Sequence, residues 1–65
     1  MLVDICWSKD QLLPDNYQTK KFETVDKAVA WCRKNFKNIF SINGHATYCT
    51  NISHLLLVDY LCNAS

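Results

Sequence analysis

One stretch of helical periodicity, set between two stretches of strand-like alternation, constrains the fold of this chain more than any other feature. From Thr24 onward, apolar side chains recur every three or four residues, which is typical of a helix with one buried face. These positions are Val25, Ala28, Val29, Cys32 and Phe36. Thr24 is a suitable N-cap, and Asp26 in the first turn suits the helix dipole. We expect the helix to end between Asn35 and Lys37.

Two antiparallel strands are predicted before this helix. In residues 2–7, Val3, Ile5 and Trp7 share one side of the chain, and Asp4 lies on the other. Residues 8–16 are mostly polar and contain the only proline, Pro14, which predicts a loop. Residues 17–23 then form the second strand.

The dipeptide Asn43-Gly44 predicts the turn of a hairpin after the helix, because these two residue types accept the positive φ angles of a type I′ turn. Residues 38–42 and 45–50 flank the dipeptide as strands. With a turn of two residues, Ile42 faces His45 across the hairpin.

The final segment, residues 52–62, has two interpretations. Its length, its leucines and the available N-caps favour a helix, whereas a buried strand is the alternative. The N-cap candidates are Thr50, Asn51 and Ser53. We therefore predict an α+β fold, ββαββα, with an antiparallel sheet packed against one or two helices. Sixty-five residues leave room for one core, so residues 1–65 form a single compact domain.

The four cysteines are expected to be reduced. An even number of cysteines in a short chain predicts disulfides only when the protein is secreted. Residues 1–7 lack the basic and long apolar segments of a signal peptide, which predicts a cytoplasmic protein. The uninterrupted apolar run from Leu55 to Val58 has four residues, far short of the roughly 20 that span a bilayer, so no membrane contact is expected.

Charge is distributed unevenly along the chain. Residues 1–19 hold one Lys and three Asp (−2), residues 20–37 hold six basic and two acidic residues (+4), and residues 38–65 hold one Asp (−1). The basic segment suits phosphates or an acidic protein surface, although a solvated helix face and a charged edge strand would look the same. The predicted partner-binding residues are Lys20, Lys21, Lys27, Trp31, Arg33, Lys34 and Lys37.

The last 28 residues are rich in apolar side chains and carry one formal charge. A helix that is apolar nearly all round must be covered on more than one side, by its own core or by another chain. The predicted self-association residues are Leu55, Leu57, Val58, Tyr60 and Leu61.

Motifs for chemistry are weak. His45, Cys49, His54 and Cys62 are zinc-ligand types, but a C-x2-C pair is missing, and on a strand His45 and Cys49 stand about 13 Å apart. The only glycine, Gly44, is needed for the turn, so no phosphate-binding glycine loop exists. The acidic residues are scattered, and no catalytic residue, metal site or cofactor is predicted.

The resulting hypothesis is a small non-enzymatic binding protein, an inhibitor or adaptor that contacts a protein partner and dimerises through its C-terminal segment. The order of its first 45 residues is similar in outline to small phage-encoded proteins that block host enzymes or defence complexes, and this likeness of architecture transfers no residue. One alternative is weak nucleic-acid binding by residues 20–37, with one arginine among seven basic residues. A small zinc protein is the second alternative.

Overall fold

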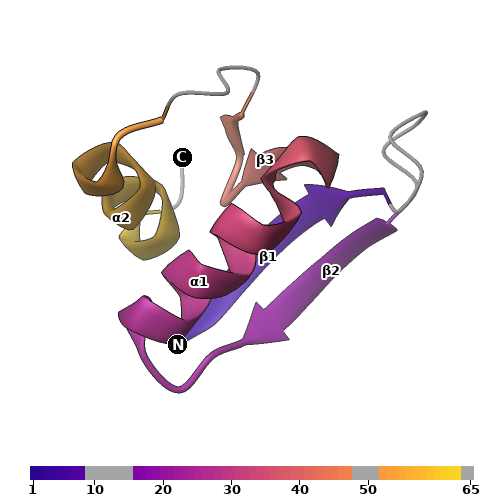
Figure 1. The fold of residues 1–65 in the computed structure, drawn as a ribbon. Helices are drawn as coiled ribbons and strands as arrows, with labels where there is room; N and C mark the ends of the chain where they lie inside the picture. The colour runs from indigo at the N-terminus through magenta and orange to yellow at the C-terminus, as the bar shows by residue number, and fades with distance from the viewer. Residues whose placement is uncertain (9–15, 48–51, 64–65) are drawn as a thin grey trace.

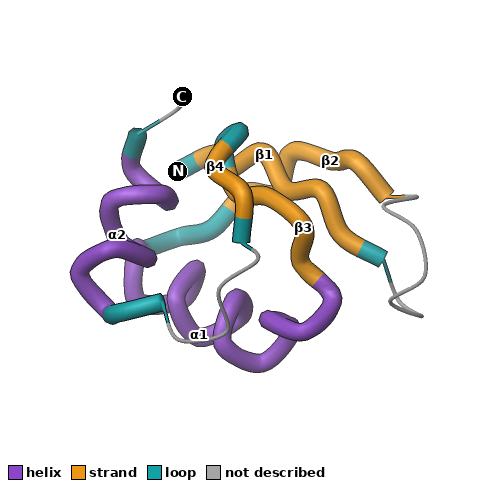
Figure 2. The backbone as a smooth tube through the Cα atoms, turned by 90° about the horizontal axis from the view of Figure 1, so that it is seen from above, coloured by secondary structure: helices purple, strands orange, loops and turns teal. Residues whose placement is uncertain are grey.

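The computed structural model describes residues 1–8, 16–47 and 52–63, which form a four-stranded antiparallel sheet with two helices on one face (Figures 1 and 2). The elements follow in the order β1 (Leu2–Trp7), β2 (Asn16–Lys21), α1 (Val25–Asn35), the 3-10 turn η1 (Phe36–Asn38), β3 (Ile39–Ile42), β4 (His45–Ala46) and α2 (His54–Cys62). The predicted α+β architecture is confirmed, including the helix at the C-terminal segment.

Strand β1 lies inside the sheet, whose strand order is β2-β1-β3-β4. It pairs with β2 from Leu2 opposite Lys21 to Trp7 opposite Asn16, and its other side pairs with β3 through a register shift after Cys6. Strands β2 and β4 are therefore the two edges of the sheet.

The alternation predicted for β1 determines which face of the sheet the helices cover. Val3 and Ile5 are fully buried, whereas Leu2 and Asp4 are exposed on the opposite face. The other core residues come from every layer of the fold: Phe22, Ala28, Val29, Cys32, Ile39, Ile42, Leu57 and Leu61. One face of the sheet thus builds a single core with both helices.

Helix α1 begins as its sequence predicts. The Thr24 side chain accepts a hydrogen bond from the backbone N–H of Lys27 at 3.2 Å. The helix ends at Asn35 and continues directly into η1, within the predicted range. The predicted apolar positions face the core, with Val25 and Phe36 at its border.

The hairpin turn has the predicted geometry. Asn43 and Gly44 have positive φ angles of 50° and 83°, and Ile42 lies opposite His45. In the described residues, β4 contains His45 and Ala46, so the prediction of a strand is wrong at Thr47. At Thr47 the side-chain hydroxyl donates to the carbonyl of Ile39 at 2.6 Å. The rest of the predicted strand, residues 48–50, lies outside the described part of the chain.

The side chain of Asn43 connects the turn to β1 and to the end of α2. Its Nδ2 donates to the carbonyls of Tyr60 at 2.9 Å and Leu61 at 3.1 Å, and its Oδ1 accepts from the N–H of Asp4 at 2.8 Å. The last carbonyls of a helix have no partner within that helix, so Asn43 satisfies groups that α2 leaves open. At its other end, α2 is capped by Ser53, whose hydroxyl accepts from the N–H of Leu56 at 3.1 Å.

Neither helix in the part of the chain that the structure describes is long and apolar enough to cross a membrane.

Replacement of Asn43 should separate its two roles, which are the positive φ angle in the turn and the side-chain hydrogen bonds to β1 and α2. Asn43→Gly keeps the positive φ but removes three side-chain hydrogen bonds, so the free energy of unfolding should fall by about 2 kcal/mol. Urea denaturation followed by circular dichroism measures this loss as a lower midpoint at unchanged slope. Asn63→Gly is the matched control, because its exposed side chain bonds only to Asp59 within the same helix end. Equal effects of the two changes would contradict the bridging role of Asn43.

Candidate functional site

Trp31 is the centre of an aromatic cluster at one flank of helix α1. Its ring meets the ring of Trp7 edge to face, with centroids 5.6 Å apart, and lies tilted against Phe22 at 6.1 Å. Edge-to-face contacts of this kind are favourable beyond the area they bury. Because Trp7 ends β1 and Phe22 follows β2, the sheet and the helix both position Trp31, which stays half-buried. Trp31 thus lies at the rim of the core, packed against it and partly exposed.

Lys20 of β2 lies over the outer side of this cluster. Its Nζ is 4.8 Å from the centroid of the Trp31 ring, within the range of a cation–π interaction. Lys20 pairs with the buried Val3, so its side chain lies on the helix-covered side of the sheet. The interaction fixes a positive charge beside an aromatic ring that is still partly open to solvent.

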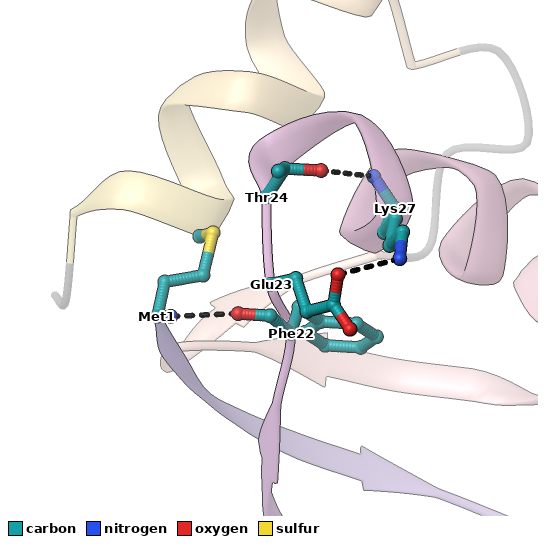
Figure 3. A network of polar contacts seen from close by, with 5 residues as sticks. All are labelled: Met1, Phe22, Glu23, Thr24 and Lys27. Carbon is teal, nitrogen blue, oxygen red and sulfur yellow. Dashed lines mark hydrogen bonds and ion pairs between the residues drawn. The ribbon is translucent and has the colours of Figure 1, made fainter.

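Two further lysines lie on the same flank of α1. Lys27 precedes Trp31 by four residues and Lys34 follows it by three, and residues at these spacings are neighbours on a helix. Both are exposed. Lys27 forms an ion pair with Glu23 at 2.7 Å, with 60% and 79% of the two side chains exposed (Figure 3). An exposed pair of this kind contributes little to stability, so a stronger partner can replace Glu23. Lys20, Lys27, Trp31 and Lys34 together are called the tryptophan–lysine surface below.

The structure does not bring the other predicted basic residues to this surface. Lys21 pairs with Leu2, which lies on the exposed face of the sheet. Arg33 is two residues from Trp31 and therefore points to another side of α1. Lys37 lies in η1, beyond the helix. The single basic segment of the sequence is thus divided in the fold between the tryptophan–lysine surface and other sides of the molecule.

The predicted self-association residues are also divided. Leu57 and Leu61 are 1% and 2% exposed and belong to the core of the protein itself, so neither is available to a second chain. Val58 and Tyr60 are half-buried against that core. Leu55 is 82% exposed, and its neighbour Leu56, which the sequence analysis did not select, is 40% exposed. The exposed leucines lie at the start of α2.

The candidate zinc ligands have other surroundings. His45 stacks on Tyr60 with ring centroids 4.5 Å apart, and its Nε2 lies 2.8 Å from the carbonyl of Asn63. His54 and Cys62 are exposed at opposite ends of α2, and Cys49 lies outside the described residues. Among residues 1–8, 16–47 and 52–63, no three ligand-type side chains gather as a metal would require.

The thiol of Cys32 is a core group rather than a nucleophile. Cys32 is fully buried, and desolvation raises the pKa of its thiol to about 11. Cys6, Cys32 and Cys62 are all free thiols, and of these Cys62 is exposed. Since the thiolate is the reactive form, Cys32 is protonated and inert at neutral pH.

Two contacts at the tryptophan–lysine surface were not predicted from the sequence: that of Trp7 with Trp31 and that of Lys20 with Trp31. The alternation of β1 does place Trp7 on the buried side with Val3 and Ile5, so a contact with the helix could have been predicted. The approach of Lys20 to Trp31 depends on the register of β2, which no local pattern in the sequence determines.

Selective alkylation should show the difference between the buried and the exposed thiol. At pH 8, a pKa of about 11 lowers the thiolate fraction of Cys32 about 100-fold relative to its ordinary value of 9.0. Iodoacetamide labelling followed by peptide mass spectrometry should find Cys62 modified and Cys32 unmodified in the native protein. In denaturing urea the two should react at similar rates. Labelling of native Cys32 as fast as Cys62 would contradict the burial of this thiol.

Comparison with known proteins adds no relative: the chain matches no protein-family profile, no curated protein and no solved structure.

Proposed function

We propose that this protein is a non-enzymatic binding module that contacts an acidic protein through the tryptophan–lysine surface. The observation that supports this most directly is Lys20, whose Nζ lies 4.8 Å from the Trp31 ring. Tryptophan is among the residues that contribute most to protein interfaces, especially where its ring is held rigidly. Here Trp7 and Phe22 pack against the ring and Lys20 lies over it. Lys27 and Lys34 lie on the same flank of α1.

The charge of the surface specifies the kind of partner. Among the described residues, Lys20 and Lys34 pair with no carboxylate, and Lys27 pairs with the exposed Glu23. Lysines beside a half-buried ring favour carboxylates, with the ring providing apolar contact. A protein of this size acting by contact alone suits the role of an inhibitor or adaptor in the cytoplasm, where free thiols persist.

Nucleic acid is the less favoured partner. Phosphate binding gains from many cationic contacts along one surface, whereas the fold distributes the six basic side chains of residues 20–37 over separate sides. The single arginine, Arg33, lies away from Trp31.

Charge reversal should locate the partner contact. The double variant Lys20→Glu and Lys34→Glu removes the positive charge beside Trp31, so proteins captured from source cells by the immobilised wild type should be lost. Arg33→Glu with Lys37→Glu is the matched control, because it changes the net charge equally on other sides of the molecule. Quantitative mass spectrometry of the captured proteins compares the two.

Retention of the same proteins by both variants, or equal loss by both, would overturn this location of the binding surface. If nuclease treatment releases the captured proteins, and the protein shifts nucleic acid in a gel at low salt, the surface would instead be assigned to nucleic-acid binding. Circular dichroism of each variant checks that its fold is intact.

The exposed start of α2 supports a second proposal, self-association through Leu55. An exposed leucine next to another partly exposed one, Leu56, is an apolar contact that a second copy can bury. The contact is small, so it suits a weak dimer.

Leu55→Asp should abolish this association without loss of the fold, because Leu55 lies outside the core. Size-exclusion chromatography with light scattering at high micromolar concentration should find a dimer for the wild type and a monomer for the variant. His54→Asp, which puts the same charge on the neighbouring exposed residue, should leave the dimer intact. A monomeric wild type at that concentration would disprove self-association.

A further inference from the structure

Strand β2 offers the longer open edge of the sheet. It has six residues and, within the described part of the chain, pairs only with β1, whereas the opposite edge strand, β4, has two. Figure 1 shows β2 at the border of the sheet, beside β1. An edge strand presents backbone N–H and C=O groups that can pair with another chain.

The pairing of β2 with β1 determines which of its backbone groups point outward. The ammonium of Met1 donates to the carbonyl of Phe22 at 2.7 Å (Figure 3). The N–H of Phe22 donates in return to the carbonyl of Met1 at 2.9 Å. In an antiparallel ladder such pairs alternate with pairs that make no hydrogen bond. By the observed register, Lys20 and Gln18 therefore bond to β1. The residues whose backbone groups point away from β1 are Tyr17, Thr19 and Lys21.

Two consecutive lysines place positive charge on both sides of this edge. Lys20 lies on the helix-covered side over Trp31, and Lys21, opposite the exposed Leu2, lies on the open face. Lys27 and Lys34 of α1 add charge on the helix side. Any strand added to β2 would pass between these groups.

This arrangement selects among possible occupants of the edge. A second copy pairing through β2 would bring two segments of +4 charge together, and a lysine directed to the covered side of an edge strand is a known protection against such pairing. An acidic strand would instead bring carboxylates beside these lysines, and opposite charges across a strand pair are stabilising. Because adjacent strand residues point to opposite faces, two consecutive carboxylates would meet Lys20 on one side and Lys21 on the other.

From this geometry we propose that β2 binds an extended acidic segment of a partner protein as an added strand of the sheet. The proposal rests on the proposed function, since the acidic partner at Trp31 is the protein that supplies the segment. The backbone of Tyr17, Thr19 and Lys21 forms the new ladder, and the lysine pair selects for adjacent acidic residues. Main-chain pairing with side-chain selection is the usual form of strand addition.

A short synthetic peptide tests this proposal directly. The probe is acetyl-Val-Thr-Glu-Glu-Thr-Val-amide, added at a few millimolar to the isotopically labelled protein. We expect the amide signals of Tyr17, Thr19 and Lys21 to shift and these amides to gain protection from hydrogen exchange. The control peptide, with Gln-Gln in place of Glu-Glu, should bind roughly fivefold more weakly, because two cross-strand charge pairs are lost.

Matched variants separate backbone pairing from contact with a side chain. Tyr17→Pro removes an outward N–H and leaves the ladder with β1 unchanged, so the edge amides should gain no protection from the acidic peptide. Tyr17→Ala keeps that N–H and should respond like the wild type. The spectrum of each free variant shows whether the sheet is intact.

Three results would overturn strand addition. Shifts at Lys27, Lys34 and the Trp31 indole without protection of the edge amides would leave the proposed acidic contact standing and remove only the added strand. No shift at any residue would likewise reject the edge, while the charge-reversal capture experiment tests the proposed function separately. Protection of the edge amides that rises with protein concentration alone would assign β2 to a second copy.

Discussion

The pairing of β1 with strands on both its sides is the constraint on which the rest of the structure depends. With Val3 and Ile5 fully buried, β1 is both the centre of the sheet and the floor of the core. In so small a chain, the free energy gained by burying apolar surface only narrowly exceeds the free-energy cost of the conformational entropy lost on folding. Both helices therefore lie on the same face of β1, and no helix among the described residues covers the opposite face of the sheet (Figure 2).

The parts of the fold that the sequence predicts well are those encoded by neighbouring residues. The Thr24 cap, the apolar positions of α1 and the Asn43-Gly44 turn are local signals, and each lies where it was expected. The order of the strands, the length of β4 and the bridge from Asn43 to α2 depend on contacts between distant residues. Local patterns carry no information about these contacts, so they could not be predicted.

At the candidate site too, the sequences of helix α2 and of the basic segment do not determine which side chains are exposed together. Leu57 and Leu61 are four residues apart and share the buried side, but α2 has apolar residues on nearly every side, so its sequence did not indicate which leucines face inward. Likewise, lysines close together in sequence point in different directions once they lie on a strand, a helix and a turn. The tryptophan–lysine surface exists only because the register of β2 brings Lys20 to Trp31.

The bridge formed by Asn43 also exposes the fold to slow chemical ageing. An asparagine followed by glycine is prone to deamidation, because the small glycine lets its backbone nitrogen attack the carbonyl carbon of the side-chain amide. Ammonia leaves, and water then opens the resulting cyclic imide. The product would carry a carboxylate where the Nδ2 of Asn43 now donates to the carbonyls of Tyr60 and Leu61. Three oxygen acceptors would then face one another without a proton between them. Loss of one amide group in the turn would thus loosen the end of α2, more than fifteen residues away in the chain.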